Sequence, residues 1–114
     1  MTLLDKDGVR LTVDDVIATV TLAGPAKRNA QSPAMWRALA EAGSLLPGDV
    51  RIVVLRGEGK SFSAGLDRQA FTPEGFDGEP SFLDMARGTD SELDATIAEY
   101  QEAFTWWRRT DWCR

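Results

Sequence analysis

A run of four consecutive apolar residues, Ile52 to Leu55, constrains the fold of this chain more than any other feature. A strand that is apolar on both faces is typical of the interior of a parallel sheet with helices packed over it. The segment before this run repeats apolar residues at helical spacing, which predicts one buried helix face. The residues of that face are Met35, Leu39, Ala42 and Leu46.

Two strands are predicted ahead of the helix. The segments from Val9 to Thr12 and from Val16 to Leu22 are rich in β-branched residues and are separated by a short acidic turn, which predicts a hairpin. Ser32 and Pro33 then provide a helix N-cap and a proline at the first helical position. The order hairpin, helix, buried strand is a βα crossover, so we predict an α/β fold.

A second helix is predicted near the end of the sequence. Thr89 is followed three residues later by Glu92, the pattern of a capping box. Apolar and aromatic residues then recur at helical spacing, and we expect them to form a buried stripe. They are Leu93, Ile97, Tyr100, Phe104 and Trp107.

Composition excludes several functional classes. The 114 residues carry a net charge of −5, and such an acidic chain would be repelled by nucleic acid phosphates. No apolar run approaches membrane-spanning length and no secretory signal precedes the first strand, so we expect a cytoplasmic protein without a membrane partner. The single cysteine, Cys113, allows neither an internal disulfide nor a cysteine metal cluster, and we expect no metal site. The absence of histidine excludes Ser-His-Asp and Cys-His catalysis.

Two loops are the candidates for chemistry. Lys27 and Arg28 follow the second strand, and two adjacent cations can either remain solvated or meet the phosphates of a nucleotide-bearing cofactor. The segment from Phe62 to Asp67 follows the buried strand and contains the small residues Ala64 and Gly65, which let a ligand approach the backbone. Such a turn can be purely structural, or it can direct backbone N–H groups at a developing oxyanion.

The strands, the helix and these two loops together resemble the N-terminal half of the enoyl-CoA hydratase/isomerase (crotonase) superfamily. The resemblance extends from about Val9 to Asp111, and both motifs stand in the family's order and spacing. It implies a crotonase-like spiral of ββα units, of which residues 1–114 would be the N-terminal part of a single domain. It also implies an acyl-CoA thioester as substrate and no separate cofactor. The parent reaction that it implies is hydration of a 2-enoyl-CoA, with isomerisation, hydrolysis or dehalogenation on the same scaffold as alternatives. Intact relatives would be homotrimers or hexamers.

The resemblance also implies roles for individual residues. The backbone around Lys27, Arg28 and Ala30 would line the CoA channel, and Ala64 would contact the adenine end of CoA. The N–H of Leu66 would form the first half of the oxyanion hole, although the family often has alanine there. The remaining residues of the substrate-binding segment are Gly65 and Asp67.

The family continues beyond a helix such as the last one here, into a second oxyanion donor and the acidic groups that move protons. We therefore expect this chain to lack those groups, which leaves its standing as an enzyme open. The alternative is a truncated, non-catalytic product or a small interaction module. Asp67 could face a substrate, but an Asp directly after a glycine turn is more often a helix N-cap. No carboxylate pair near the motif can be assigned as acid and base.

Overall fold

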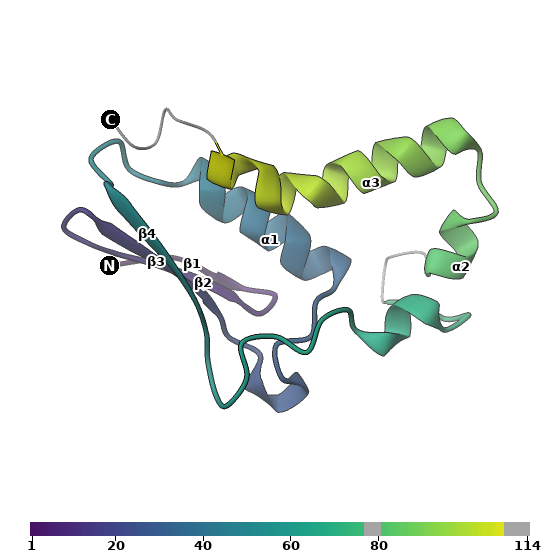
Figure 1. Cartoon of the computed structure of the whole chain (residues 1–114), viewed down its shortest axis with the longest axis horizontal. Coiled ribbons are helices and arrows are strands. Elements are labelled where there is room, and N and C mark those ends of the chain that lie inside the picture. Colours follow the sequence, from purple (N-terminus) through teal and green to yellow (C-terminus); the bar gives the residue numbers. More distant parts are fainter. Residues whose placement is uncertain (77–80, 109–114) are drawn as a thin grey trace.

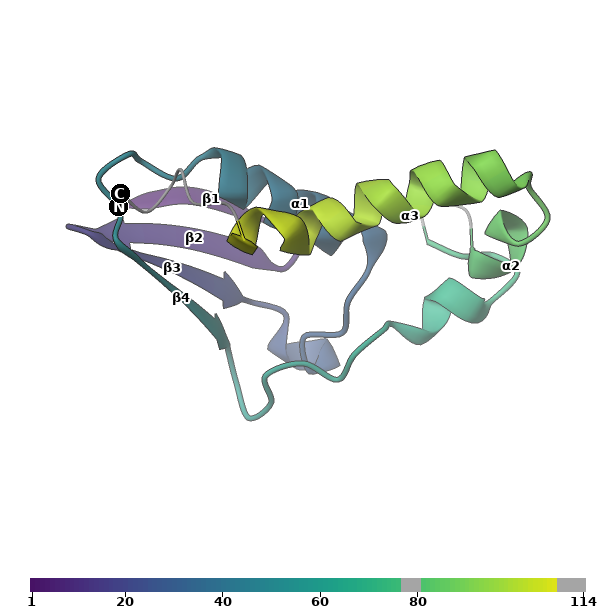
Figure 2. The ribbon, with the colours of Figure 1, turned by 45° about the horizontal axis from the view of Figure 1, so that its top comes forward.

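The computed structural model describes residues 1–76 and 81–108. Asp111, where the family resemblance ends, and Cys113 therefore lie outside the described residues. The described chain forms one twisted four-stranded sheet, in which neighbours in space are also neighbours in sequence (Figures 1 and 2). The strands are β1 (Thr2–Lys6), β2 (Val9–Asp14), β3 (Ile17–Leu22) and β4 (Ile52–Gly57). β1, β2 and β3 pair antiparallel, and β3 pairs parallel with β4.

The sequence did not predict β1. Its residues include Asp5 and Lys6, which are depleted in strands, and no strict alternation of apolar residues marks it. It forms because β2 offers it a free edge, with Lys6 opposite Val9 and Leu4 opposite Leu11. The predicted hairpin of β2 and β3 is confirmed.

The helices begin where their capping residues predict. The main helices are α1 (Pro33–Ser44), α2 (Phe82–Met85) and α3 (Asp90–Thr105). The Ser32 hydroxyl accepts the Met35 N–H at 3.2 Å, and the Thr89 hydroxyl accepts the Glu92 N–H at 3.1 Å. Three short 3-10 helices complete the described part: η1 (Pro25–Lys27), η2 (Arg68–Phe71) and η3 (Trp106–Arg108).

One face of the sheet carries the core. Alternate residues of β2 and β3 point toward α1, which lies between the sheet and α3 (Figure 1). The βα crossover therefore forms as predicted, and the fold is mixed α/β. The core residues are Val9, Leu11, Ala18, Val20, Leu22, Met35, Ala38, Leu39, Ala42, Val50, Ala103 and Trp106.

The predicted interior strand is instead an edge strand. β4 lies at one end of the sheet order, and Ile52, Val54 and Leu55 are 51%, 40% and 43% exposed. The parallel pairing with β3 was expected, but no described strand covers the opposite side of β4. The apolar run correctly indicated a parallel strand, whereas burial on both faces was wrong for the residues that the structure describes.

The predicted stripe on α3 was only partly correct. Tyr100 is buried, but Ile97 and Phe104 are exposed, and Ala103 and Trp106 occupy the contact with α1. The cause is a close approach: a Cβ atom at Gly43 would lie 2.5 Å from the Trp106 ring, so that ring rests directly on the α1 backbone. The contact rotates α3 away from the stripe that spacing alone selects.

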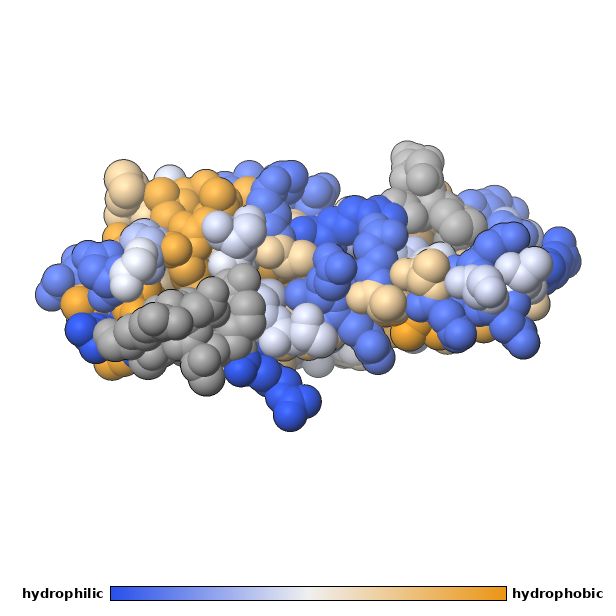
Figure 3. Space-filling view, turned by 90° about the horizontal axis from the view of Figure 1, so that it is seen from above, coloured by the Kyte–Doolittle hydropathy of each residue, from blue (hydrophilic) through white to orange (hydrophobic). Residues whose placement is uncertain are grey.

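The surface on the helix side of the molecule has a hydrophobic half and a hydrophilic half. Hydrophobic residues gather over the half of the molecule that holds the sheet and α1, and hydrophilic residues dominate over the N-terminal part of α3 (Figure 3). No helix in the described ranges is long and apolar enough to cross a membrane.

Candidate functional site

The two loops selected from the sequence meet at the carboxyl ends of β3 and β4. The Ala64 N–H donates to the Arg28 carbonyl at 2.8 Å, and the Gln31 N–H donates to the Gly65 carbonyl at 2.7 Å. The Asp67 N–H completes the contact by donating to the Gln31 carbonyl at 2.8 Å. The two loops are therefore neighbours at this end of the sheet. We call residues 24–31 together with residues 58–67 the two-loop clasp.

Asn29 is the centre of the two-loop clasp. It is fully buried, and its backbone is left-handed at φ +56°, a conformation that asparagine tolerates better than most residues. Its Oδ1 accepts the Gly24 N–H at 2.8 Å, within its own loop. Its Nδ2 lies 3.0 Å from three carbonyl oxygens of the other loop, those of Glu58, Ser61 and Phe62. The side chain thus satisfies backbone groups that would otherwise be buried without partners.

Sequence reasoning assigned no role to Asn29, although it stands beside the two basic residues. The available signal was its residue type, because asparagine is favoured at left-handed positions and bonds to nearby backbone. The spacing of loop residues gave no indication that one amide would hold three carbonyls of a segment about thirty residues away.

Ser63 and Gln31 extend the network to α1. The Ser63 hydroxyl donates to the Asn29 carbonyl at 2.8 Å and accepts the Gly65 N–H at 3.1 Å. The Gln31 amide donates to Ser63 at 3.2 Å and accepts the Trp36 indole N–H at 3.0 Å. Ser63 therefore has a structural position, consistent with the absence of any histidine to activate it.

Leu66 presents a free backbone donor. In its parallel bridge with Gln31, the hydrogen bonds are made by the residues on either side of it, Gly65 and Asp67. The Leu66 N–H consequently points away from Gln31, and it donates to no acceptor within the described part of the chain. The Leu66 N–H is thus left without an acceptor among the described residues, whereas the N–H groups of Ala64, Gly65 and Asp67 are already bonded.

A polar cavity of about 600 Å³ opens beside Leu66. Lys27 and Arg28 contribute its basic side, together with Arg68, and small alanine side chains leave room along the backbone. The residues that line it are Ala26, Lys27, Arg28, Ala30, Ala64, Leu66, Asp67 and Arg68. All the predicted site residues except Gly65 therefore line one cavity, and Gly65 lies between two of them.

Asp67 caps a helix, as favoured from the sequence. Its carboxylate accepts the Gln69 N–H at 3.0 Å at the start of η2, and it lies 3.9 Å from the Lys27 ammonium. Among the described residues that line the cavity, it is the one acidic side chain. No cluster of three or more metal-ligating side chains occurs within residues 1–76 and 81–108.

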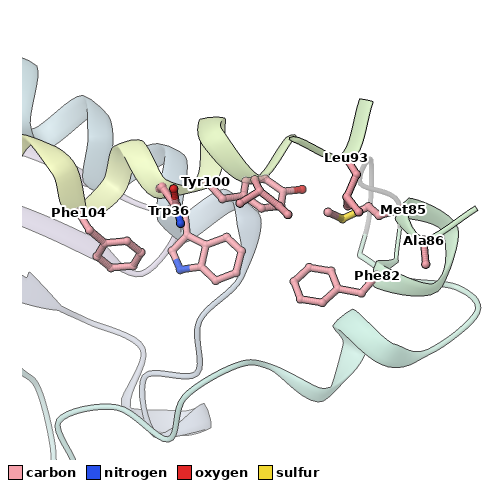
Figure 4. A pocket seen from close by; sticks show the side chains of 9 residues that line it. Trp36, Phe82, Met85, Ala86, Leu93, Tyr100 and Phe104 are labelled. Carbon is pink, nitrogen blue, oxygen red and sulfur yellow. The ribbon is translucent and has the colours of Figure 1, made fainter. Parts of the chain in front are cut away.

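A second, apolar cavity of about 380 Å³ lies between α2 and α3 (Figure 4). Trp36 stands at its α1 side, with its ring 4.9 Å from Tyr100 and 6.5 Å from Phe82. Met85 and Leu93 point into the same space from α2 and α3. Burial raises the pKa of the Tyr100 hydroxyl above its usual value of 10.0, although the nearby Arg37 guanidinium opposes the shift.

The chain is similar to proteins whose names refer to acyl-CoA substrates. An 88-residue stretch is 39% identical to the mitochondrial Δ(3,5)-Δ(2,4)-dienoyl-CoA isomerase of Mus musculus, covering 75% of this chain and 26% of that protein. A crystal structure from Thermobifida fusca YX, of a protein named as an enoyl-CoA hydratase, is 45% identical with a TM-score of 0.80 over 91% of this chain. The chain belongs to the enoyl-CoA hydratase/isomerase (crotonase) family. Its mixed α/β fold is crotonase-like.

The chain covers part of the length of its relatives. The chain spans 38% of the Thermobifida fusca protein, and no family model matches it. A further structure of that protein, in complex with acetoacetyl-CoA, has a TM-score of 0.78 and is 46% identical over 90% of this chain and 39% of that one. Structures of this family member therefore include one with an acyl-CoA bound.

Proposed function

We propose that this chain binds an acyl-CoA thioester at the two-loop clasp, with the Leu66 N–H donating to the thioester oxygen. The observation that carries the proposal is the free Leu66 N–H beside a cavity with a basic side. A relative that is 46% identical crystallises with acetoacetyl-CoA, which supports this substrate class.

Each part of the clasp would have a distinct task. Lys27 and Arg28 would meet the phosphates of CoA, since paired cations on a loop suit a phosphate-rich ligand. Ala30 and Ala64 would leave room for the CoA moiety to pass, with Ala64 at its adenine end. Gly65 has φ +90°, a conformation that glycine adopts freely, and it sets the direction of the next N–H. Asp67 would hold that turn through its cap.

For the parent reaction we propose hydration of a 2-enoyl-CoA. Water adds to C3, and a proton adds to C2 of the enolate that the oxyanion donors stabilise. This requires a base to take a proton from water and an acid to deliver one to C2. Asp67 is the acidic group in the described lining, and it already caps η2 beside Lys27. We therefore propose that this chain binds and polarises the thioester and does not complete the hydration alone.

The alternative function is that of a non-catalytic interaction module. The exposed apolar residues of β4 favour it, because soluble chains seldom leave such a strand uncovered. The two functions use different surfaces, so a ligand test at Leu66 separates them.

The decisive experiment measures polarisation of the thioester. Acetoacetyl-CoA carrying ¹³C at the thioester carbon is titrated into the chain, and the carbonyl stretch is followed by infrared spectroscopy. We expect binding with a shift to lower frequency. Leu66→Pro removes the N–H and should abolish the shift and weaken binding about ten-fold, the value of roughly one hydrogen bond.

Leu66→Ala is the matched control, because it shortens the side chain and keeps the N–H. It should retain the carbonyl shift. Equal loss in both variants would assign the effect to the side chain and contradict the proposal. Crotonyl-CoA hydration by the unmodified chain at rates typical of an enzyme would contradict the proposal that it does not complete the reaction alone.

A further inference from the structure

The backbone of Gln31 holds the peptide units on both sides of the proposed thioester donor. The Gln31 N–H donates to the Gly65 carbonyl at 2.7 Å, and the Gln31 carbonyl accepts the Asp67 N–H at 2.8 Å. The Gly65 carbonyl and the Leu66 N–H belong to one planar trans peptide unit, so they point in opposite directions. The bond from Gln31 to Gly65 therefore sets the direction in which the Leu66 N–H points.

The side-chain amide of Gln31 connects the two-loop clasp with α1. Its Nε2 donates to the Ser63 hydroxyl at 3.2 Å, and its Oε1 accepts the Trp36 indole N–H at 3.0 Å. The opposite orientation of the amide would place a donor against the indole donor, so one orientation satisfies both partners. Ser63 also accepts the Gly65 N–H at 3.1 Å. Both backbone polar groups of Gly65 are thus bonded either to Gln31 or to the partner of its side chain.

Trp36 takes its position from aromatic side chains outside the clasp. Its ring lies 4.9 Å from that of Tyr100 and 6.5 Å from that of Phe82, at the wall of the apolar cavity (Figure 4). The Phe82 ring meets the Phe71 ring edge to face at 5.6 Å. Phe71 belongs to η2, the short helix that Asp67 caps. The packing around the apolar cavity therefore reaches back to the segment that follows the donor.

We propose that Gln31 is a positioning residue, which fixes the direction of the Leu66 N–H and ties it to the Trp36 wall of the apolar cavity. The inference rests on the proposed function, because it concerns the donor that we assign to the thioester oxygen. Gln31 does not line the polar cavity in the described part of the chain, so it acts through the Gly65–Leu66 peptide. Such a role matters because a donor stabilises an oxyanion best when it is already held where the charge develops.

The alternative is that Gln31 only joins a loop to the start of α1. It directly precedes the N-cap residue Ser32, and the residue at that position often fixes how the chain enters a helix. An anchor of this kind would change the free energy of unfolding but would leave the carbonyl frequency of a bound thioester unchanged. The carbonyl stretch therefore distinguishes the two roles.

The first measurement uses the chain without ligand. The Trp36 indole N–H signal is followed in ¹H–¹⁵N NMR spectra and is assigned by its absence from Trp36→Phe. Gln31→Met keeps the length of the side chain but removes both amide groups. The indole signal should then move, and its hydrogen exchange should become about five-fold faster or more, the value of roughly one hydrogen bond. An indole signal unchanged in both respects would overturn the proposal.

The second measurement follows the infrared carbonyl stretch of acetoacetyl-CoA that carries ¹³C at the thioester carbon. Gln31→Met should lose most of the shift that the unmodified chain produces, and it should weaken binding about three- to ten-fold. Gln31→Glu keeps the acceptor for the Trp36 indole but lacks the donor to Ser63, so its carbonyl shift should be intermediate. Gln31→Glu and Trp36→Phe carry the comparison if Gln31→Met does not fold.

Gln101→Met is the matched control. Gln101 is an exposed residue of α3 that also lines the apolar cavity, but its side chain makes no hydrogen bond within the described residues. The control should retain the carbonyl shift and keep the Kd within about two-fold of the unmodified chain. Equal losses of the shift in Gln31→Met and Gln101→Met would overturn the proposal.

The two measurements also separate this inference from the proposed function. If the unmodified chain produces no carbonyl shift, thioester binding at Leu66 is overturned and the positioning role with it, and the indole signal alone decides whether Gln31 joins Trp36 to the clasp. If the unmodified chain produces a shift that Gln31→Met retains in full, thioester binding stands and the positioning role of Gln31 is overturned.

Discussion

The two-loop clasp directly follows β4 in the chain, yet its hydrogen-bonding groups and those of the outer edge of β4 are satisfied to different degrees. In the clasp, the buried amide of Asn29 is bonded at both its oxygen and its nitrogen, and Ser63 bonds three partners. Along β4, the backbone of Val53 and Leu55 has no described partner on its outer side. The clasp is thus held by hydrogen bonds within the described chain, whereas the outer edge of β4 has no described strand beside it.

The contrast separates two conditions for function. A ligand-binding loop can be ordered by local hydrogen bonds, and this chain supplies them all between residues 24 and 67. A stable domain also needs its apolar surface to be buried, and Ile52, Val54 and Leu55 of β4 are exposed in the described structure. The substitutions below test each side of this comparison.

The largest effect should come from Asn29→Asp. The substitution keeps the shape of the side chain but replaces the Nδ2 donor with an oxygen that faces three carbonyls. Leaving buried acceptors unpaired costs about 1 to 3 kcal/mol for each group, so we expect a loss of roughly 3 kcal/mol or more in the free energy of unfolding. Urea denaturation measures it. A loss below about 1 kcal/mol would show that the clasp does not depend on this amide.

A paired substitution compares the sheet core with its edge. Val20→Thr places a hydroxyl at a fully buried position facing α1, and should cost about 2 kcal/mol. Val54→Thr makes the same change at a position that is 40% exposed, and should alter stability by less than about 0.5 kcal/mol. Denaturant titration of both variants gives the comparison. Similar losses would mean that β4 is as well covered as β3.

Gly65→Ala tests the backbone of the clasp. A Cβ atom there would meet nothing within 4 Å, but φ is +90°, so the cost is conformational and should be about 1 kcal/mol. Gly48→Ala is the control, because its Cβ would also meet nothing within 4 Å and its φ lies outside the left-handed region. Thermal unfolding should show a lower Tm for Gly65→Ala alone. Equal Tm values would argue against a constrained turn before Leu66.

The smallest effect concerns Tyr100 and alkaline pH. Its pKa is raised in the folded chain, chiefly by burial, so the folded state holds the phenol proton more tightly than the unfolded state does. Stability should therefore fall as pH rises above about 10, where the unfolded chain loses this proton first. Tyr100→Phe should make that decline shallower while changing little near pH 7. An unchanged slope between about pH 9 and 11 would contradict this linkage.

The sequence predicted the elements that carry strong local signals. Ser32 and Thr89 marked the starts of both long helices because a hydroxyl at the N-cap satisfies a free backbone N–H. The two loops were found because their residue types suggested chemistry, and the structure brings them together. The role of Asn29 was missed because its partners lie about thirty residues away, and nothing local indicates such a contact.

Tertiary contacts explain the other differences. The β4 sequence correctly indicated a parallel strand, but a single strand cannot reveal whether its neighbours are part of the described chain. The α3 stripe was displaced because Trp106 packs onto Gly43, and a glycine on a facing helix leaves no trace in the periodicity of α3. Sequence patterns thus predicted what each segment becomes more reliably than what it touches.

The linear order of the sheet has a consequence for how the chain emerges during synthesis. Because the described strands lie in the order β1-β2-β3-β4, each pairs with strands adjacent in sequence, and all four are encoded by the first 57 residues. The β1–β2 and β2–β3 pairings close short turns, and contacts of that kind favour rapid folding. The four strands, α1 and the first loop of the clasp can therefore assemble before α3 has emerged from the ribosome, and α3 would add to a preformed surface.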